Sequence, residues 1–380
     1  MKVKSIAVLG STGSIGASTL RVVQHLPDSF QVAALAAHSN VELLAEQIAH
    51  FNPRIACIYE SVHVQKLQSR FPHVRIVCGD EGLAEIVSHS SVDYVVMAIV
   101  GMRALMPTIQ AIEAGKTVGL ASKEVLVSAG EYVSTLAQEK GVKLLPIDSE
   151  HSALFQCLDG KNPAEIRRVI LTASGGPFRK HDKSQLTHVT VEEALSHPTW
   201  NMGPKVTIDC STLINKGLEM IEARWFFDLA PEKIEVVIHP QSLVHSFVEF
   251  ADGSILAQIN EPNMIYPIQY ALTYPERKPG MFPPFDFVKN SQWTFSHPDT
   301  DRFPALRLAQ ESMKTGGSAP AYLNAANEVL VDRFLKRQIS WSSIASLLEK
   351  LLMRHSVIPA SSLDSILAVD REAREEAKLA

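Results

Sequence analysis

Residues 145–151 join an apolar, strand-like run to two carboxylates and an imidazole. Asp148 and Glu150 are two positions apart, so in extended or turn backbone both side chains can point the same way. Two hard oxygen ligands on one side suit a divalent cation, and His151 is close enough to support them. The same residues also suit a helix start, with Asp148 or Ser149 as the cap and Glu150 in the first turn. Both interpretations stay open on these residues alone.

A second stretch with chemical potential is residues 208–219. Its last part has helical spacing, and Glu219 could supply a third carboxylate to a cation. Asn215 and Lys216 precede it at a turn, where an amide and an ammonium can bind an anion. A solvated glutamate on a helix surface is the alternative interpretation.

Two further segments contain polar groups in irregular sequence. Residues 173–178 follow a strand-like run and form a small-residue turn that can present Ser174 and bare backbone amides to a phosphate. Residues 197–203 contain His197 and Trp200 between prolines and a glycine, where no regular element fits. Such a loop is either buried packing or a lid over a ligand.

The start of the chain predicts the element that holds a nucleotide. Residues 5–9 form a buried-strand run, which meets a glycine-rich turn at residues 10–16 and then a helical pattern. Such a turn lets backbone N–H groups approach a pyrophosphate at a helix N-terminus. The spacing is GxxGxxG, and a plain tight turn is the alternative. The cofactor-contacting residues that we expect here are Thr12, Gly13, Ser14 and Ile15.

The second strand, residues 32–35, indicates which dinucleotide is used. No acidic residue ends this strand, and an acid there would grip the ribose 2′-hydroxyl of NAD and repel a 2′-phosphate. Its absence favours NADP. Ala37, His38, Ser39 and Asn40 follow the strand. They could donate to the phosphate, or they could simply cap the next helix.

The spacing of strands and helices predicts three structural parts. Strand runs near 55, 75, 94, 117 and 143 alternate with helix-length segments, which indicates a doubly wound parallel sheet. Lys123 and Glu124 follow the sixth strand, where ligands of open sheets lie, although a solvated charge pair is the alternative. The predicted fold class is α/β, with an N-terminal Rossmann-like sheet, a central α+β catalytic domain and a C-terminal helical bundle. The predicted parts are residues 1–150, 151–274, a linker at 275–311 and 312–380.

Composition excludes several function classes. The 380 residues are 46% hydrophobic with a net charge of −5, so there is ample core and no basic field for nucleic acid. A small-molecule partner is expected. The four cysteines form no CxxC pair or disulfide framework, which fits a reducing cytoplasm. No apolar run approaches the ~20 residues of a membrane span.

Taken together, ten motifs in this order resemble the 1-deoxy-D-xylulose 5-phosphate reductoisomerase family over almost the whole chain. They are LGSTGSIG, AIVGM, ASKE, PIDSEHSA, ASGGPF, HPTWNMGPK, IDCSTLINKGLEMIEARW, IHPQSLVHSFV, DGSILAQ and LNAANE. The resemblance implies an NADPH domain, a metal-dependent catalytic domain and a homodimer in the non-mevalonate isoprenoid pathway. It implies reduction and isomerisation of the sugar phosphate to 2-C-methyl-D-erythritol 4-phosphate, with Mg²⁺ or Mn²⁺, or Co²⁺, as the metal. A retro-aldol path and a concerted ketol shift both fit the same residues.

The resemblance also assigns roles to residues of this chain. The implied metal ligands are Asp148, Glu150 and Glu219. The expected catalytic residues are Lys123, Glu150, His151, His197 and Trp200, with residues 197–203 as the closing loop. The expected substrate contacts are Lys123, Ser149, Glu150, Ser174, His197, Cys210, Ser211, Asn215, Lys216 and Glu219. The expected cofactor contacts, besides the glycine turn, are Ala37, His38, Asn40, Ser122, Glu124 and Gly203.

The chain departs from the family pattern at two positions. Cys210 stands where the family commonly has serine after the aspartate of DSATMMNKGLE, and either Cys210 or Ser211 could take that role. His38-Ser39 stands where a Gly-Lys or Gly-Arg pair is often found near the cofactor. Two rival functions remain from the residues alone: an NAD(P)-dependent dehydrogenase without metal, and a dinucleotide-sensing protein without catalysis. A metal-free dehydrogenase would keep its activity when divalent cations are removed. Oxidation of NADPH that depends on the sugar phosphate would exclude the sensing protein.

Overall fold

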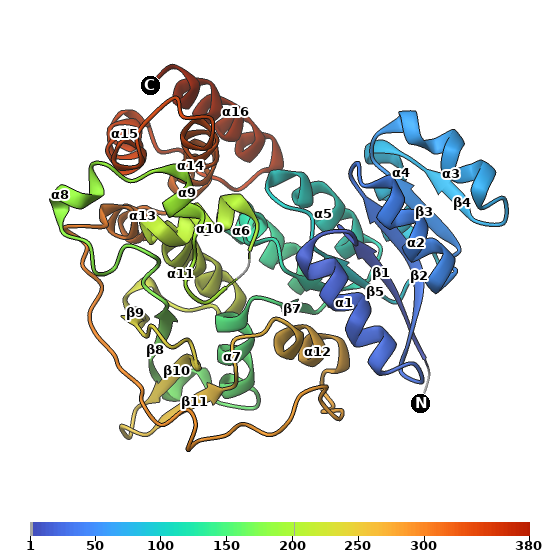
Figure 1. Ribbon diagram of the computed structural model, residues 1–380, viewed down its shortest axis with the longest axis horizontal. Coiled ribbons are helices and arrows are strands. Elements are labelled where there is room, and N and C mark those ends of the chain that lie inside the picture. Colours follow the sequence, from blue (N-terminus) through green and yellow to red (C-terminus); the bar gives the residue numbers. More distant parts are fainter. Residues whose placement is uncertain (1–2, 201) are drawn as a thin grey trace. The chain divides into compact units, whose positions relative to one another are not determined.

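The computed structural model describes residues 3–200 and 202–380, shown as a ribbon in Figure 1. The described chain divides into two compact units, neither of which is one continuous stretch. Unit 1 is Met1–Val125, Val133–Ser152 and Asn263–Pro283, and unit 2 is Leu126–Tyr132, Ala153–Pro262 and Pro284–Ala380. The boundaries predicted at 150, 274 and 311 do not coincide with these units, because residues 263–283 belong with the N-terminal segments.

Unit 1 is built on a parallel sheet. In the described part of the unit, seven strands have the order β4-β3-β2-β1-β5-β6-β7, and all neighbours are parallel. The strands are β1 (Lys4–Leu9), β2 (Phe30–Ala37), β3 (Ile55–Ile58), β4 (Arg75–Val77), β5 (Tyr94–Met97), β6 (Thr117–Leu120) and β7 (Leu144–Pro146). The strand order changes direction at β1, which is where open sheets of this type bind ligands. This arrangement confirms the predicted Rossmann-like doubly wound sheet.

Helices connect these strands because each strand must cross over to lie parallel to its neighbour. The connecting elements are α1 (Ser14–His25), α2 (Val41–Phe51), η1 (Ser61–His63), α3 (Val64–Arg70), α4 (Gly79–Ser88), η2 (Met102–Ala104) and α5 (Leu105–Glu113). Two helices, α6 (Lys123–Glu139) and α7 (Ser149–Leu158), contain residues of both units. The strands β3 and β5 are fully buried, as their uninterrupted apolar sequences predict.

A late segment of the chain returns to unit 1. The helix α12 (Ile265–Thr273) packs against α1. The hydroxyl of Tyr94 on β5 donates to Ala271 O at 3.1 Å, and Lys4 Nζ donates to Leu272 O at 2.6 Å. These bonds satisfy polar groups of the sheet that would otherwise be costly to bury.

Unit 2 contains a mixed sheet. In its described part, four strands have the order β11-β10-β8-β9; β8 and β9 are parallel, and β10 is antiparallel to both β8 and β11. The strands are β8 (Ile166–Ala173), β9 (Ile234–Ile238), β10 (Val244–Phe250) and β11 (Ile255–Ile259). A tight turn joins the last two: Gly253 has a φ of +85°, and Asp252 Oδ1 accepts from Ser254 N–H at 2.8 Å.

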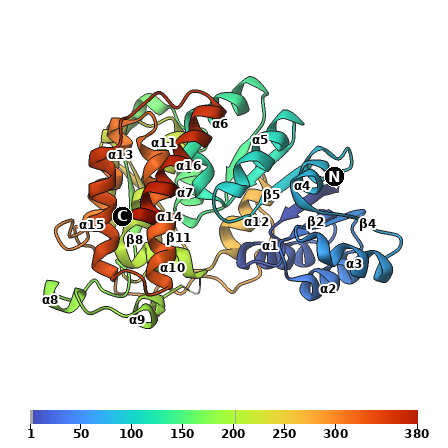
Figure 2. The same cartoon turned by 90° about the horizontal axis from the view of Figure 1, so that it is seen from above.

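The helices of unit 2 share one apolar core with this sheet. They are η3 (Pro163–Glu165), α8 (Lys183–Leu186), α9 (Val191–Leu195), α10 (Pro204–Thr212), α11 (Ile214–Phe227), η4 (Pro231–Lys233), α13 (Pro304–Thr315), α14 (Ala319–Leu335), α15 (Trp341–Arg354) and α16 (Leu363–Leu379). Both views show α14 beside α15 and α16 (Figures 1 and 2). The core includes Leu171 of β8, Leu218 of α11 and Tyr322 of α14. The C-terminal helices therefore complete the core of the central sheet.

The proline-rich stretch before α13 has no helix or strand among the described residues between Thr273 and Pro304, whereas the last part of the predicted linker, residues 304–311, is the start of α13. It is held to the sheet by an isolated bridge between Ile238 and Ser296. Elsewhere in residues 3–200 and 202–380, no helix combines the length and the apolar character that crossing a bilayer requires.

Candidate functional site

The glycine turn of unit 1 opens the N-terminus of α1. Gly10 has a φ of +86°, and a Cβ there would lie 2.4 Å from Ala98 O, so only glycine fits this position. A Cβ on Gly16 would lie 2.2 Å from Gly10 O. The helix cap is Gly13; no side chain caps the helix, and its first turn contains no acidic residue. Its N–H groups and dipole are therefore available to an anionic ligand such as a pyrophosphate.

The neighbouring contacts keep this turn in place. Ser11 Oγ donates to Gln47 Oε1 at 2.7 Å, and Gln47 Nε2 donates to Ser11 O at 2.9 Å. Both residues are buried. Thr12, Ser14 and Ile15 remain at least partly exposed beside the turn. The residues predicted to contact a dinucleotide therefore lie together on one rigid turn.

The residues at the end of β2 are those that the sequence predicted to contact the ribose phosphate of a dinucleotide. Ala37 is the buried last residue of the strand, and His38, Ser39 and Asn40 are exposed. Asn40 caps α2, because its side chain accepts from Leu43 N–H at 3.2 Å. The helix-cap interpretation therefore holds for Asn40. His38 contacts Arg103 instead, a residue that the sequence analysis did not single out.

Lys123 and Glu124 lie at the end of β6 and are 8% and 4% exposed, which excludes the alternative of a solvated charge pair. Lys123 Nζ lies 2.9 Å from Asp148 Oδ2. Ser122 is also buried, and its hydroxyl donates to Ile99 O. Adjacent strand ends thus place an ammonium directly against the carboxylate that follows β7.

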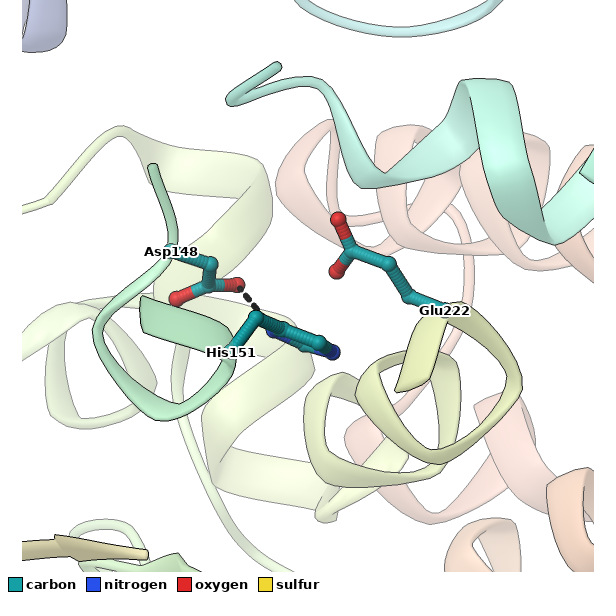
Figure 3. Close-up of side chains that lie close together, drawn as sticks. All are labelled: Asp148, His151 and Glu222. Carbon is teal, nitrogen blue, oxygen red and sulfur yellow. Dashed lines mark ion pairs between the residues drawn. The ribbon is translucent and has the colours of Figure 1, made fainter. Parts of the chain in front are cut away.

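Residues 148–151 lie at a helix start and also bring together groups that could bind a cation, the two interpretations that the sequence left open. Asp148 immediately precedes α7, at the position of a helix-start residue, and its Oδ1 accepts from the adjacent Ser149 N–H at 2.8 Å. His151 Nδ1 lies 3.9 Å from Asp148 Oδ2 and is fully buried (Figure 3). The hydroxyl of Ser149 donates to Glu150 Oε2. Two carboxylates and an imidazole lie together at the start of one helix, with Lys123 beside them.

Unit 2 contains a second group of polar residues on α11. Asn215 Nδ2 and Lys216 Nζ both donate to the carboxylate of Glu219. Glu219 is 1% exposed, so the alternative of a solvated helix glutamate is excluded. Leu213 joins α10 to α11 with a φ of +64°, which is strained for a residue with a side chain. On the same helix, Glu222 (labelled in Figure 3) is fully buried.

His197 and Ser174 form a polar pair within unit 2. His197 Nε2 lies 3.0 Å from Ser174 Oγ, and His197 Nδ1 accepts from Thr199 N–H at 3.1 Å and Trp200 N–H at 2.9 Å. Because Nδ1 accepts, the proton of the neutral ring is on Nε2 and points to Ser174. Burial, together with the Arg179 charge, lowers the pKa of His197 below its ordinary value.

The turn after β8 brings Ser174 close to α10. Gly175 and Gly176 have φ values of +83° and +67°, and a Cβ on Gly176 would lie 2.6 Å from Cys210 O. Two consecutive left-handed glycines therefore allow the backbone to approach this helix closely. The predicted phosphate-binding turn and the Cys210 segment are neighbours in space.

Cys210 and Ser211 differ in their surroundings, which answers the question that the sequence left open. Ser211 is fully buried; its hydroxyl donates to Ile208 O at 2.7 Å and accepts from Trp341 Nε1 at 2.8 Å. Its only proton is thus used inside the protein, so the prediction that Ser211 contacts the substrate is corrected. Cys210 is partly exposed.

The predicted lid, residues 197–203, begins at His197 and ends at Gly203, which caps α10. Asn201 lies outside the described residues. Trp200 is partly buried, and its ring lies 6.4 Å from that of His245 in an edge-on arrangement. Burial lowers the pKa of His245 to about 4. His245 on β10 was not predicted, because its sequence, Val-His-Ser-Phe, indicates only a strand.

Comparisons with known proteins agree with this arrangement along the chain. Profiles described as 1-deoxy-D-xylulose 5-phosphate reductoisomerase, its C-terminal domain and the DXP reductoisomerase C-terminal domain match residues 6–130, 144–227 and 259–376. The 1-deoxy-D-xylulose 5-phosphate reductoisomerase of Protochlamydia amoebophila is 56% identical over 98% of this chain and 97% of its own. That of Chlamydia trachomatis serovar D is 50% identical over 99% of both chains.

Two solved structures are similar over nearly the full length. The reductoisomerase from Zymomonas mobilis in complex with NADPH has a TM-score of 0.94 and 43% identity, covering 100% of this chain and 99% of that one. A DOX-P reductoisomerase in complex with NADPH, fosmidomycin and magnesium has a TM-score of 0.95 and 40% identity, covering 99% and 98%. The doubly wound sheet, its glycine turn and the buried carboxylates define an oxidoreductase of the dinucleotide-dependent class. The chain belongs to the 1-deoxy-D-xylulose 5-phosphate reductoisomerase family.

Proposed function

We propose that this protein converts 1-deoxy-D-xylulose 5-phosphate to 2-C-methyl-D-erythritol 4-phosphate in the non-mevalonate isoprenoid pathway, using NADPH and a divalent cation. The observation that carries the proposal is the full-length match to reductoisomerases, together with the partly exposed Asp148 and Glu150 and the buried Glu219 at the positions of the matched motifs. A dehydrogenase without a metal would have no evident use for these three carboxylates.

The donor set fits a divalent cation. Asp148, Glu150 and Glu219 each offer a carboxylate oxygen, and hard oxygen ligands suit Mg²⁺, with Mn²⁺ or Co²⁺ as substitutes. Lys123 lies 2.9 Å from Asp148, so it compensates that charge when no cation is bound. We propose these three carboxylates as the metal ligands and Lys123 as their neighbour toward the substrate.

NADPH fits the glycine turn, because α1 has an uncapped N-terminus without an acid in its first turn. Thr12, Gly13, Ser14 and Ile15 would hold the pyrophosphate region. We also propose cofactor contacts at the ends of β2 and β6 and at the start of α10. Those residues are Ala37, His38, Asn40, Ser122, Glu124 and Gly203.

When bound, NADPH supplies the hydride and the cation acts as a Lewis acid toward the substrate carbonyl. The chain's own residues then bind and orient the sugar phosphate. Ser174, Asn215 and Lys216 are the proposed phosphate contacts, with Cys210 at the position where the family commonly has serine. His197 holds the Ser174 hydroxyl through its Nε2 proton.

Three more residues complete the proposed site. Ser149 and Glu150 form a hydrogen-bonded pair that we place at the substrate hydroxyls, with the buried His151 supporting Asp148. Trp200 is proposed to cover the substrate and exclude water, which strengthens the charge interactions beneath it.

The decisive experiment follows NADPH absorbance with 1-deoxy-D-xylulose 5-phosphate, before and after removal of divalent cations with a chelator. Oxidation that requires the sugar phosphate, stops with the chelator and returns with Mg²⁺ is the expected result. Oxidation that continues without a cation would instead support the metal-free dehydrogenase, and no oxidation would support the sensing protein.

We further propose that the protein is a cytoplasmic homodimer. The support for the compartment is that all four cysteines are free thiols. The support for the dimer is β11, which ends the strand order of its sheet and exposes Ile255 and Leu256 by 53% and 42%. An apolar edge strand of this kind is stable when it pairs with another chain. Light scattering would test this interface: the wild type should have the mass of a dimer and Leu256→Lys that of a monomer. The same mass for both proteins would contradict this interface.

A further inference from the structure

A group of charged and aromatic side chains lies at the strand ends of unit 1, beside the glycine turn. Arg103 Nη1 lies 2.7 Å from His38 Nε2, although 65 residues separate them in the sequence. His38 directly follows β2, Tyr59 directly follows β3, and Arg103 lies in η2, the first element after β5. In a parallel sheet all these strand ends share one edge, which is the edge where ligands bind.

The contact defines the tautomer of the neutral His38 ring. A guanidinium has donors and no acceptor, so Arg103 must donate and His38 Nε2 must accept. The proton of the neutral ring is then on Nδ1, which lies 3.7 Å from Glu60 Oε1. His38 therefore acts as a link that holds the guanidinium from one side and faces a carboxylate with the other.

The ring of Tyr59 contacts the side chains of both His38 and Arg103. The ring of His38 stacks on that of Tyr59 with a centroid distance of 5.2 Å and an angle of 14°. Arg103 Cζ lies 5.2 Å from the centroid of the same ring, which is a cation–π distance. Gly101, with a φ of +76°, lets the chain turn into η2 just before Arg103. The position of the guanidinium is thus defined by two rings and a backbone turn.

The cluster has the chemistry of a phosphate site. Arg103 is exposed, and its planar fork of donors matches a phosphate group. No acid ends β2, where an acid would repel a 2′-phosphate. The acid beside the cluster is Glu60, and it lies within 3.7 Å of His38 and 3.5 Å of His63.

We propose that Arg103 recognises the 2′-phosphate of NADPH and that His38 positions its guanidinium, so that these two residues determine the preference for NADPH over NADH. The inference rests on the proposed use of NADPH. It assigns the cationic role to a residue after β5, whereas His38-Ser39 after β2 supplies no permanent charge.

Steady-state kinetics with both cofactors test the assignment. Arg103→Gln is expected to raise the KM for NADPH by about 10- to 100-fold, because charged hydrogen bonds to the phosphate are lost. The constants for NADH should stay within about twofold, since NADH lacks the phosphate. Arg103→Lys keeps the charge but loses the planar fork of donors, so its KM for NADPH should lie between those of the wild type and Arg103→Gln. Arg54 is an exposed arginine before β3 in the same unit, so Arg54→Gln is the matched control. It should change the kinetic constants for neither NADPH nor NADH.

His38 needs a test that separates positioning from folding. His38→Ala should raise the KM for NADPH more than it raises the KM for NADH. His38→Gln retains an acceptor for the Arg103 N–H and should restore most of the NADPH affinity. Equal losses for NADPH and NADH in both variants would show a structural role and overturn this part of the proposal.

Binding without turnover gives an independent measurement. Calorimetry should show that the wild type binds adenosine 2′,5′-bisphosphate more tightly than adenosine 5′-monophosphate, and that Arg103→Gln removes this difference. A wild type that prefers the bisphosphate, with no change in Arg103→Gln, would overturn the assignment while leaving the use of NADPH intact. A wild type without preference would contradict both the inference and the proposed cofactor.

Discussion

Trp341 on α15 donates a hydrogen bond of 2.8 Å from its indole Nε1 to the buried hydroxyl of Ser211 on α10. Its ring also packs edge-on against Phe178, at a centroid distance of 5.4 Å. Phe178 follows the Ser174 turn, and Ser211 follows Cys210. One side chain of the C-terminal helices therefore supports both segments that we propose around the substrate phosphate.

Ser211→Ala is expected to lower the free energy of unfolding by about 1 to 3 kcal/mol, because the Trp341 N–H is left buried without its acceptor. The KM for the sugar phosphate should stay unchanged. Cys210→Ser is the paired variant; it should leave stability nearly unchanged and lower this KM, because a hydroxyl is the better donor. Denaturant titration and kinetics of both variants measure the two effects. A raised KM in Ser211→Ala would show that Ser211 contacts the substrate.

Glu150→Gln should abolish turnover while the fold stays intact. The substitution removes an anionic ligand from the proposed carboxylate set without changing side-chain size. Circular dichroism and the cation dependence of the rate measure the outcome. Glu139→Gln, an exposed glutamate at the end of α6, is the control for loss of one charge. Near-normal activity of Glu150→Gln at saturating Mg²⁺ would refute its assignment as a ligand.

Acid should weaken substrate binding through His197. Its pKa is lowered from the ordinary 6.5 first by burial and then by the charge of Arg179. A lowered pKa means that the neutral ring stabilises the folded arrangement fully above pH 6.5, and that this contribution is lost as the pH falls through the lowered pKa. Protonation would place a proton on Nδ1 against two backbone N–H donors.

The measurement is 1/KM for the sugar phosphate as a function of pH at fixed cation concentration. Wild type should show an acid limb below pH 6.5 that is steeper than that of His197→Gln, which cannot titrate. The second ionisation of the substrate phosphate, with a pKa of about 6, affects both proteins equally. Identical limbs in the two proteins would exclude His197 as the titrating group.

Trp200→Ala distinguishes a lid from core packing at residues 197–203. The partly buried indole predicts a loss of stability within about 1 kcal/mol together with a loss of turnover or substrate affinity. A core tryptophan would instead lose roughly 3 to 5 kcal/mol. Thermal melting and steady-state kinetics of the variant decide between them. A strongly lowered melting temperature with unchanged kinetic constants would refute the lid.

Local sequence predicted the regular elements well, because uninterrupted apolar runs have few alternatives to buried strands. Residues 5–9 correspond to β1 (Lys4–Leu9), and the strand-like run before residue 173 corresponds to β8 (Ile166–Ala173). Ser340 caps α15, accepting from Ser343 N–H at 3.3 Å, as serine before an apolar helical stripe commonly does. These features depend on neighbours in the chain, so a single sequence contains the information.

Long-range packing could not be predicted in the same way. The hydrogen bond between Tyr94 and Ala271, which places α12 in unit 1, joins residues 177 positions apart. The direction of the Ser211 hydroxyl depends on Trp341, 130 positions away. Each polar side chain has several possible partners of equal chemistry, and the tertiary structure selects one of them.

The return of residues 263–283 to unit 1 has a consequence for how the protein is made. Tyr94 and Lys4 find their carbonyl partners on α12 only after the ribosome has synthesised more than two thirds of the chain. An N-terminal fragment that ends at Ser152 would leave these polar groups without their native acceptors. The dinucleotide-binding sheet is therefore the first part to be translated, but it is completed only when α12 has followed, and truncation at Ser152 should yield an unstable fragment.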